Sequence, residues 1–428
     1  MRSRLPLLAV LLTGCPSCLT RETADTGYEV VVDYMCYRDL DGDGFGSEVI
    51  DNTSPCGDWE GFSNDGGDCD DDNPDVNPGL PDRCDRVDRS CDGAWTPSVP
   101  GTCATLAEGL AIAQDGETVL VGPGTYSGPV DFGGKAIALI GQAGAAQTTL
   151  QGDGSGSVVR FTNGEGASSV LQGFTVSGGL AEEGGGVLVE GASPTLRDLV
   201  ITGNHATRGG GLALRSSSAT LERVELRQNL ADGEGGGLAI ADCTALDLHN
   251  LGVYGNQAQR GGGLVWESST GTLTNAFGAG NHAAASGGFA LLRGQGAVLQ
   301  QLSLVGNSAE LGGALALEGA SAQVGNSVLA GNFSTSGPSV YATDATLDLR
   351  YSDSFEATAP AFVGLPDPTG SAGNLAKDPL FVDISAPPEG LRVLYGSPLR
   401  DAGDPAVLDA DGTRSNMGAF GGPYGSWP

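Results

Sequence analysis

Basic residues are scarce in this sequence. Lysine and arginine together supply 21 of its 428 residues, against 52 aspartates and glutamates, and the formal net charge is −31. A field of that sign repels phosphate backbones, so the composition argues against nucleic acid as a partner. The whole chain carries three histidines.

Aromatic residues and long hydrophobic runs are also few. Aromatic side chains make up 6% of the chain, so a core must be built from Val, Leu, Ile and Ala. That supply suits many thin layers better than one large globular core. No run beyond the amino terminus is long enough to span a bilayer. Glycine is abundant instead, with 71 residues, but without the spacing of collagen.

The amino terminus has the pattern of an export signal. A basic segment at residues 1–4 precedes an apolar run at residues 5–12, which is too short for a permanent membrane span. The run ends Leu-Thr-Gly-Cys at residues 12–15, which resembles the lipobox of bacterial lipoprotein signal peptides. The resemblance implies cleavage after a signal peptide at 1–14 and acylation of the Cys15 thiol.

A lipid on Cys15 would anchor the mature chain to a membrane through a tether at residues 15–35. Pro16 stands where an aspartate would indicate inner-membrane retention in some bacteria, so we expect an exported protein at the outer membrane or cell surface. An ordinary secretory signal with a chance cysteine is the alternative.

Six of the nine cysteines fall within 68 residues, and their even number in an exported chain predicts a disulfide framework. Spacing alone leaves 15 pairings open. Zinc is disfavoured, because the spacings of zinc sites are missing and no histidine precedes His205. The six are Cys36, Cys56, Cys69, Cys84, Cys91 and Cys103.

The same region, residues 36–103, is strongly acidic and predicts a calcium-binding module. Asp39, Asp41 and Asp43 alternate along the chain, and Gly44 occupies the sixth position of the run, as in an EF-hand loop. The twelfth position, where an EF-hand has glutamate, is Ile50, so a shorter calcium loop is expected. Hard oxygen ligands of this kind favour calcium over transition metals.

A second acidic run places Asp68, Asp70 and Asp72 as donors to another calcium ion. Residues 36–93 resemble the Asp/Cys-rich, MopE-like metal-binding repeat of exported bacterial proteins. The chain departs from that repeat by carrying arginine at 86 and 89, where internal salt bridges could replace a cation. A solvated acidic stalk held by disulfides alone is the alternative.

The rest of the chain is a repeat. Each unit reads Asn-x-Ala, then a glycine cluster, then apolar stretches that alternate with polar positions, which is the period of a strand. Successive repeat asparagines are 25, 27, 25, 26 and 25 residues apart. Three short strands per repeat predict an all-β fold, a right-handed parallel β-helix of roughly nine coils between residues 117 and 350. The repeat asparagines are Asn204, Asn229, Asn256, Asn281, Asn307 and Asn332.

Two ladders should run along the coils. Stacked asparagine amides would satisfy the carbonyl groups of the turns. The residue before each glycine cluster alternates in sign, which would fix the register between neighbouring coils. The alternating residues are Glu183, Arg208, Glu234 and Arg260.

The start of the β-helix region, at 104–350, has a helix-then-strand order that resembles the amino-terminal cap of pectin-lyase-like proteins. The glycine repeats, such as Gly-Gly-Ala-Leu at 312–315, are similar to those of polymorphic outer membrane proteins. Residues 351–428 resemble the carboxy-terminal coil and capping region of bacterial surface β-helix proteins. These resemblances imply an exported solenoid with a cap at each end.

Catalytic candidates are few. Glu222 and His249 occupy matching positions in neighbouring coils and form the best acid–base pair, although a weak one. His205 and His282 follow repeat asparagines and are expected to be turn residues, and Cys243 is expected to be a small buried residue.

The sequence therefore favours a non-catalytic protein that binds or adheres at the cell surface, with a glycan or a surface protein as ligand. A carbohydrate-active enzyme, either a polysaccharide lyase or a glycoside hydrolase, is the first alternative. A purely structural envelope spacer is the second.

Overall fold

The computed structural model describes residues 19–21, 31–33, 35–51, 60–357 and 360–425. Cys15, the signal peptide 1–14 and Cys56 lie outside the described residues. The chain forms two compact units, one from residues 1–97 and 101–104, the other from residues 98–100 and 105–428.

The first unit is made of short strands and turns. It contains an antiparallel sheet in the order β5-β3-β6 and two further strand pairs, β1–β2 and β4–β7. Among its described residues, the buried hydrophobic side chains are Cys36, Val76 and Cys103. The described part of the unit therefore buries almost no apolar side chains that could hold it together. Its strands are β1 (Leu19–Arg21), β2 (Val31–Asp33), β3 (Cys36–Arg38), β4 (Phe45–Gly46), β5 (Glu48–Asp51), β6 (Phe62–Ser63) and β7 (Asp65–Gly66).

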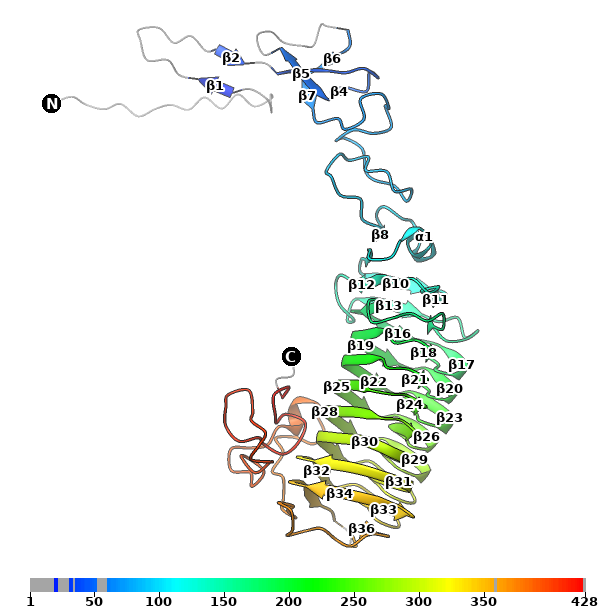
Figure 1. The fold of residues 1–428 in the computed structure, drawn as a ribbon, viewed down its shortest axis with the longest axis vertical. Helices are drawn as coiled ribbons and strands as arrows, with labels where there is room; N and C mark the ends of the chain where they lie inside the picture. The colour runs from blue at the N-terminus through cyan, green and yellow to red at the C-terminus, as the bar shows by residue number, and fades with distance from the viewer. Residues whose placement is uncertain (1–18, 22–30, 34, 52–59, 358–359, 426–428) are drawn as a thin grey trace, which may run out of the picture. The chain divides into compact units, whose positions relative to one another are not determined.

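The second unit is an all-β parallel solenoid of about 11 turns, as predicted (Figure 1). Three strand ladders run along it, and their strands pair in parallel from coil to coil. The turns exceed the nine predicted for 117–350, because strands before and after that range extend the ladders.

The first ladder contains β8 (Ser98–Val99), β9 (Thr118–Val121), β12 (Ala138–Gly141), β15 (Val170–Gln172), the first halves of β19 (Thr195–Thr202), β22 (Thr220–Arg227), β25 (Leu246–Tyr254) and β28 (Gly271–Ala279), parts of β30 (Ala290–Val305) and β31 (Leu315–Gly325), and β34 (Thr346–Arg350). The second contains β10 (Gly124–Ser127), β13 (Thr148–Gln151), β16 (Thr175–Ser177), the second halves of β19 to β28, the end of β30, β32 (Val328–Ala330) and β35 (Asp353–Phe355). The third contains β11 (Val130–Asp131), β14 (Val159–Phe161), β18 (Val187–Glu190), β21 (Leu212–Arg215), β24 (Leu238–Ala241), β27 (Leu264–Glu267), the starts of β30 and β31, β33 (Val340–Thr343) and β36 (Phe362–Val363). A separate sheet contains β17 (Leu180–Glu183), β20 (His205–Arg208), β23 (Leu230–Glu234), β26 (Gln257–Arg260) and β29 (His282–Ser286).

Alternation along the long strands builds the core. In β19 the side chains of Leu196, Leu199 and Ile201 are buried, and the same positions are apolar one coil further on. Asp198 lies between the two halves of β19 with a φ of 53°, and this left-handed residue turns the chain from the first ladder to the second. Equivalent residues repeat this turn in later coils.

The asparagine ladder is confirmed. Asn229 Nδ2 donates to Asn256 Oδ1 at 3.1 Å and to the Ile201 carbonyl at 2.9 Å, and the other repeat asparagines follow the same scheme. Each amide therefore satisfies a turn and also links two coils. At the end of the ladder the carboxylate of Glu356 replaces the amide and accepts from Asn332 Nδ2 at 3.0 Å. Gly211 lies beside this ladder, where an added Cβ would come within 2.8 Å of Asn229 Nδ2.

The alternating charges are in register from coil to coil, as predicted. Their ion pairs, however, reach a second column of charges at the ends of the third-ladder strands. Arg208 pairs with Glu267 at 2.5 Å, and Arg293 pairs with Glu234 at 2.8 Å. Both pairs join residues 59 positions apart, about two coils. The two columns therefore form one network.

Two short helices are present among the described residues. Helix α1 (Leu106–Ile112) begins at a capping box formed by Thr105 and Glu108, and it lies against β8 and β9. The 3₁₀ helix η1 (Glu389–Leu391) belongs to the carboxy-terminal segment, residues 364–425. Figure 1 shows this segment, in orange and red, alongside β28 to β32.

Candidate functional site

The first acidic run of the amino-terminal unit folds into a tight loop. Carboxylate oxygens of Asp39, Asp41 and Asp43 all lie within 4.8 Å of one another. The Gly42 and Gly44 amides donate to the two oxygens of Asp39, at 2.7 and 3.1 Å, and both glycines have positive φ. Glycine is required here because the loop turns back on a carboxylate.

Two aspartates of the second run join this loop. Asp71 Oδ1 accepts from the Leu40 amide at 3.0 Å, which ties the two runs together. Asp68 is 5% exposed, and the charges of Asp41 and Asp43 both act on it. The two runs therefore contribute to one acidic centre rather than to two separate ones. We call it the acidic centre; its residues are Asp39, Asp41, Asp43, Asp68 and Asp71.

Two oxygens of the acidic centre have no partner. Asp41 Oδ2 and Asp68 Oδ2 are buried and accept no hydrogen bond among the described residues. Desolvation, reinforced by the neighbouring carboxylates, raises the pKa of Asp41 and of Asp68. Buried carboxylate oxygens are normally paired, so this arrangement fits a hard cation between them.

The second predicted donor set does not assemble. Asp68 is buried within the acidic centre, whereas Asp70 and Asp72 are exposed. Asp70 Oδ2 accepts from Asn73 Nδ2 at 3.4 Å. The second run turns at residues 71 and 72 and does not alternate as a strand, so the side chains of 68 and 71 are buried and those of 70 and 72 are exposed.

A further acidic cluster was not predicted from the sequence. Carboxylate oxygens of Asp82, Asp88 and Asp92 lie within 4.8 Å of one another. Arg89 forms an internal salt bridge in this half of the module, as expected, with Asp85 at 2.6 Å. The other expected replacement, Arg86, lies with its guanidinium 5.0 Å from the centroid of the Trp95 ring. In the sequence Asp92 belongs to a Cys-Asp-Gly run at 91–93, but no spacing indicated that Asp82 and Asp88 would join it.

The disulfide framework is present. Cys69 bonds to Cys91 and Cys84 bonds to Cys103, and Cys36 is also disulfide-bonded. Two pairings of the predicted set are thereby fixed. In a unit with so little apolar core, these bonds restrict the unfolded chain and stabilise the fold.

The catalytic candidates of the solenoid are in register, but each already contacts other side chains. Glu222 lies opposite His249 in the neighbouring coil, and its carboxylate forms an ion pair with Arg223. His249 lies 3.4 Å from Asp247, and its ring stacks on Tyr424 at 5.3 Å between centroids. Tyr424 of the carboxy-terminal segment therefore covers the His249 ring, and Arg223 neutralises the charge of the Glu222 carboxylate.

The remaining sequence candidates of the solenoid have structural contacts. His205 lies 2.9 Å from Asp232, and His282 lies 2.9 Å from the Ser308 hydroxyl. Both were expected to be turn residues, but each begins a strand, His205 in β20 and His282 in β29, and they lie in register along the same sheet. Cys243 is buried as expected, and burial raises the pKa of its thiol.

The carboxy-terminal segment is held by polar side chains at the left-handed turn positions. Asn275 Nδ2 donates to the Ala419 and Gly421 carbonyls at 2.9 and 2.6 Å. One coil further, Gln301 contacts the Ser415 hydroxyl, and Asn326 Oδ1 accepts from the Asp404 amide at 2.6 Å. Residues that turn the chain thus also bind the segment that covers it.

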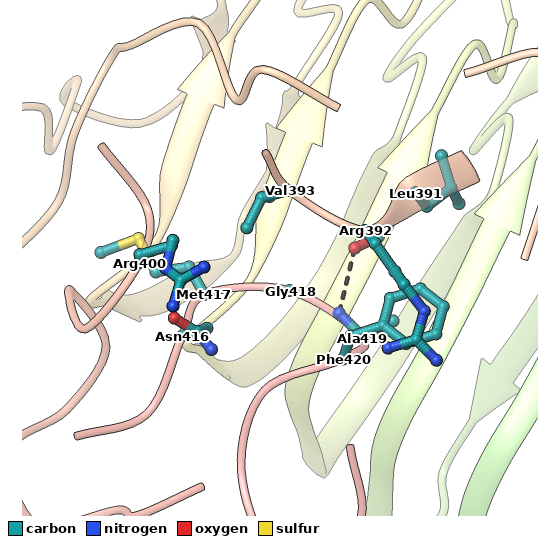
Figure 2. Close-up of a pocket in the computed structure, with 10 residues that line it drawn as sticks. Leu391, Arg392, Val393, Arg400, Asn416, Met417, Gly418, Ala419 and Phe420 are labelled. Carbon is teal, nitrogen blue, oxygen red and sulfur yellow. Dashed lines mark hydrogen bonds between the residues drawn. The ribbon is translucent and has the colours of Figure 1, made fainter. Parts of the chain in front are cut away.

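A small pocket lies beneath this segment, and Figure 2 shows the residues around it. Its volume is about 180 Å³, and its wall includes the apolar side chains of Leu391, Val393 and Met417. Arg392 and Arg400 also line it, with their guanidiniums over the Phe420 and Tyr395 rings at 4.3 and 5.0 Å. Neither guanidinium forms an ion pair with a carboxylate in the part of the chain that the structure describes.

A larger pocket, of about 360 Å³, lies beside the last coils. Its lining is mostly polar. It includes side chains of the first ladder and Asp404 of the carboxy-terminal segment.

Comparisons with known proteins give no family. No family model matches the chain, and no curated protein matches it. Among solved structures, the pectate lyase Pel9A is 14% identical, with a TM-score of 0.45, over 76% of this chain and 95% of its own. The A-module of the Azotobacter vinelandii mannuronan C-5 epimerase AlgE4 is 16% identical, with a TM-score of 0.38, over 61% of this chain and 86% of its own.

A PL6 family polysaccharide lyase from Pseudopedobacter saltans is 10% identical, with a TM-score of 0.26, over 71% of this chain and 97% of its own. Likenesses of this size carry no argument about substrate or activity. None of the helices in the described part of the chain has the length and apolar character needed to cross a bilayer.

Proposed function

We propose that this chain is an exported, lipid-anchored protein in which a calcium-binding module precedes a non-catalytic, ligand-binding β-solenoid. The observation that carries the proposal is the pair of buried, unpartnered oxygens on Asp41 and Asp68. They lie among carboxylates in a unit that has almost no apolar core. In such a unit a bound ion would add to the stability that the disulfides supply.

Calcium is the proposed ion because every donor in the acidic centre is a carboxylate oxygen. Calcium accepts six to eight oxygen ligands in flexible geometry, whereas magnesium demands a tighter octahedron. Asp39, Asp41, Asp43, Asp68 and Asp71 would hold it, and the ion would remove the repulsion among them. Its role is structural, and no reaction step passes through it.

Calcium titration calorimetry on the disulfide-intact chain tests this proposal. Asp68→Asn should weaken binding at least tenfold, because Asp68 is buried in the acidic centre. Asp72→Asn is the matched control, since it removes the same charge from an exposed side chain of the same run that is not part of the acidic centre. Equal loss in both variants, or no calcium binding at millimolar concentration, would remove the acidic centre from the proposal.

The anchor is proposed from the lipobox-like Leu-Thr-Gly-Cys at 12–15. Cys15→Ser should move the protein from the detergent phase to the aqueous phase, or leave an uncleaved precursor. Cys18→Ser is the control, because that cysteine lacks the preceding pattern. Detergent partitioning that is unchanged in Cys15→Ser would contradict lipid anchoring.

A second candidate function is a carbohydrate-active enzyme that acts on acidic polysaccharide. It is favoured by Arg392 and Arg400, two unpaired guanidiniums in one pocket, because a uronate lyase needs cations to neutralise the sugar carboxylate. Ultraviolet detection of unsaturated products from pectate and alginate decides between the two. Turnover that is lost in Arg392→Gln/Arg400→Gln would establish the enzyme, and we expect none in the wild type.

A further inference from the structure

The pocket of about 360 Å³ beside the last coils lies where a column of outward side chains on the first ladder is interrupted. Strand register places Glu222, His249, Thr274 and Gln300 one above another, one coil apart. The next residue of the column is Gly325, and the column then continues at Arg350. A glycine at this point places no side chain between those of Gln300 and Arg350, and the end of the Gln300 side chain lies over it beside the pocket.

The gap is not required by the backbone. Gly325 is not in the left-handed region, and an added Cβ would meet only the end of the Gln300 side chain, at 2.5 Å. That side chain is flexible and half-buried, so a larger residue could be accommodated. The glycine at 325 therefore leaves room for the end of the Gln300 side chain at the edge of the pocket, and backbone strain does not require it.

The lining of the gap is rich in planar polar groups. The amides of Gln300 and Gln323 have no hydrogen-bond partner among the described residues, so their donors and acceptors face the pocket unused. Arg350 pairs with Asp348 at 2.7 Å, and both side chains remain about half exposed or more. Tyr351 adds an aromatic wall, and Asp404 closes the opposite side.

These groups define the chemistry of a ligand. Hydroxyl groups both donate and accept, so they match amides, carboxylates and a guanidinium presented together. The charges of Arg350 and Asp348 cancel in their ion pair, so the carboxylate of Asp404 gives the lining a net negative charge. That charge disfavours an anionic ligand. At about 360 Å³ the pocket falls within the size range of small-molecule sites, but its lining is polar where such sites are usually apolar.

We infer that this pocket binds a neutral saccharide. The hydroxyls would be held by Gln300, Gln323 and Arg350, and the ring would lie against Tyr351. The inference rests on the proposed role of the solenoid as a binding scaffold and gives that role a site and a ligand class. It does not depend on the acidic centre, because the calcium titration tests that centre separately.

Isothermal titration with neutral hexasaccharides of glucose, N-acetylglucosamine, xylose and mannose tests the inference on the full chain. At least one should bind with a dissociation constant below about 1 mM. Gly325→Gln continues the column into the gap and should weaken that binding at least tenfold. Ser321→Gln is the control, because it makes the same addition at an exposed position of the same strand outside the pocket.

Thermal melting shows whether each variant is folded, and Gln323→Ala offers a second variant that removes an amide without adding bulk. Tighter binding of galacturonate oligomers than of any neutral sugar would overturn the inference in favour of the pocket at Arg392 and Arg400. Absence of binding across the neutral panel, or binding that Gly325→Gln leaves unchanged, would also overturn it.

Discussion

Single residues of the acidic unit show what spacing can and cannot predict. The alternation of Asp39, Asp41 and Asp43 predicted a loop, and the structure has that loop because glycines at 42 and 44 permit its turns. The contribution of Asp68 and Asp71 to the same centre was not predictable, because it depends on how two runs about 30 residues apart fold together. The spacing of residues within one run predicts a turn, but it does not predict which other turn will pack against it.

Asp353 is a residue whose ionisation should control stability. It is fully buried in β35, and one oxygen accepts from the Lys377 amide while the other has no partner. Burial, with the nearby charges of Asp378 and Glu356, raises its pKa to about 7. Because the folded pKa lies above the unfolded one, near 3.8, the protonated carboxyl stabilises the fold below that lower value. This stability is lost as pH rises through about 7.

We therefore expect Asp353→Asn to remove a pH dependence of up to about 4 kcal/mol in the free energy of unfolding between pH 4 and pH 8. Denaturant unfolding of the wild type and the variant at several pH values measures the difference. Asp348→Asn is the control, since Asp348 is exposed. Parallel curves for wild type and Asp353→Asn would show that the pKa of Asp353 does not differ between the folded and the unfolded chain.

The strands of the solenoid were largely predictable because their pattern recurs in every repeat of the sequence. Three alternating apolar stretches per 25 residues indicated the strands, and the asparagine spacing indicated the register of one coil on the next. The carboxy-terminal segment was not predictable in the same way. Its place on the sheet depends on Asn275, Gln301 and Asn326, which in the sequence are ordinary polar residues of the coils.

Within these elements, the asparagine ladder should be stabilising well beyond one hydrogen bond per residue. Asn256→Ala removes the side chain that donates to the buried Leu226 carbonyl and accepts from the Asn229 backbone N–H, so we expect a cost of about 2–4 kcal/mol in unfolding free energy. Gln257→Ala, at the next and exposed position, should change it by less than about 0.5 kcal/mol. Chemical denaturation compares the two, and equal effects would refute a special role for the ladder.

At the scale of the whole molecule, the two units are stabilised by different means. The solenoid buries its own apolar ladders and pairs its backbone from coil to coil. The amino-terminal unit has disulfides and clustered carboxylates in place of an apolar core. Composition predicted this division, because the acidic residues and cysteines gather before residue 104 and the repeats follow it.

Removal of calcium should therefore affect one unit alone. With disulfides intact, chelation is expected to expose residues 36–97 to protease, while fragment 105–428 stays resistant. Mass spectrometry of the fragments, with and without millimolar calcium, locates the cleavages. Asp41→Ala/Asp43→Ala should be cleaved even in calcium, and equal protection of the wild type under both conditions would mean that disulfides suffice.

The charge network also constrains how a protein of this kind can change in length over evolution. Repeats are readily gained or lost by unequal recombination, one coil at a time. Here the residue before the glycines alternates from Glu183 to Arg208 to Glu234 to Arg260. Loss of a single coil would bring two like charges face to face and break pairs that reach across two coils. Loss of two coils would preserve the alternation, so descendants of this solenoid should differ from it by even numbers of coils within this stretch.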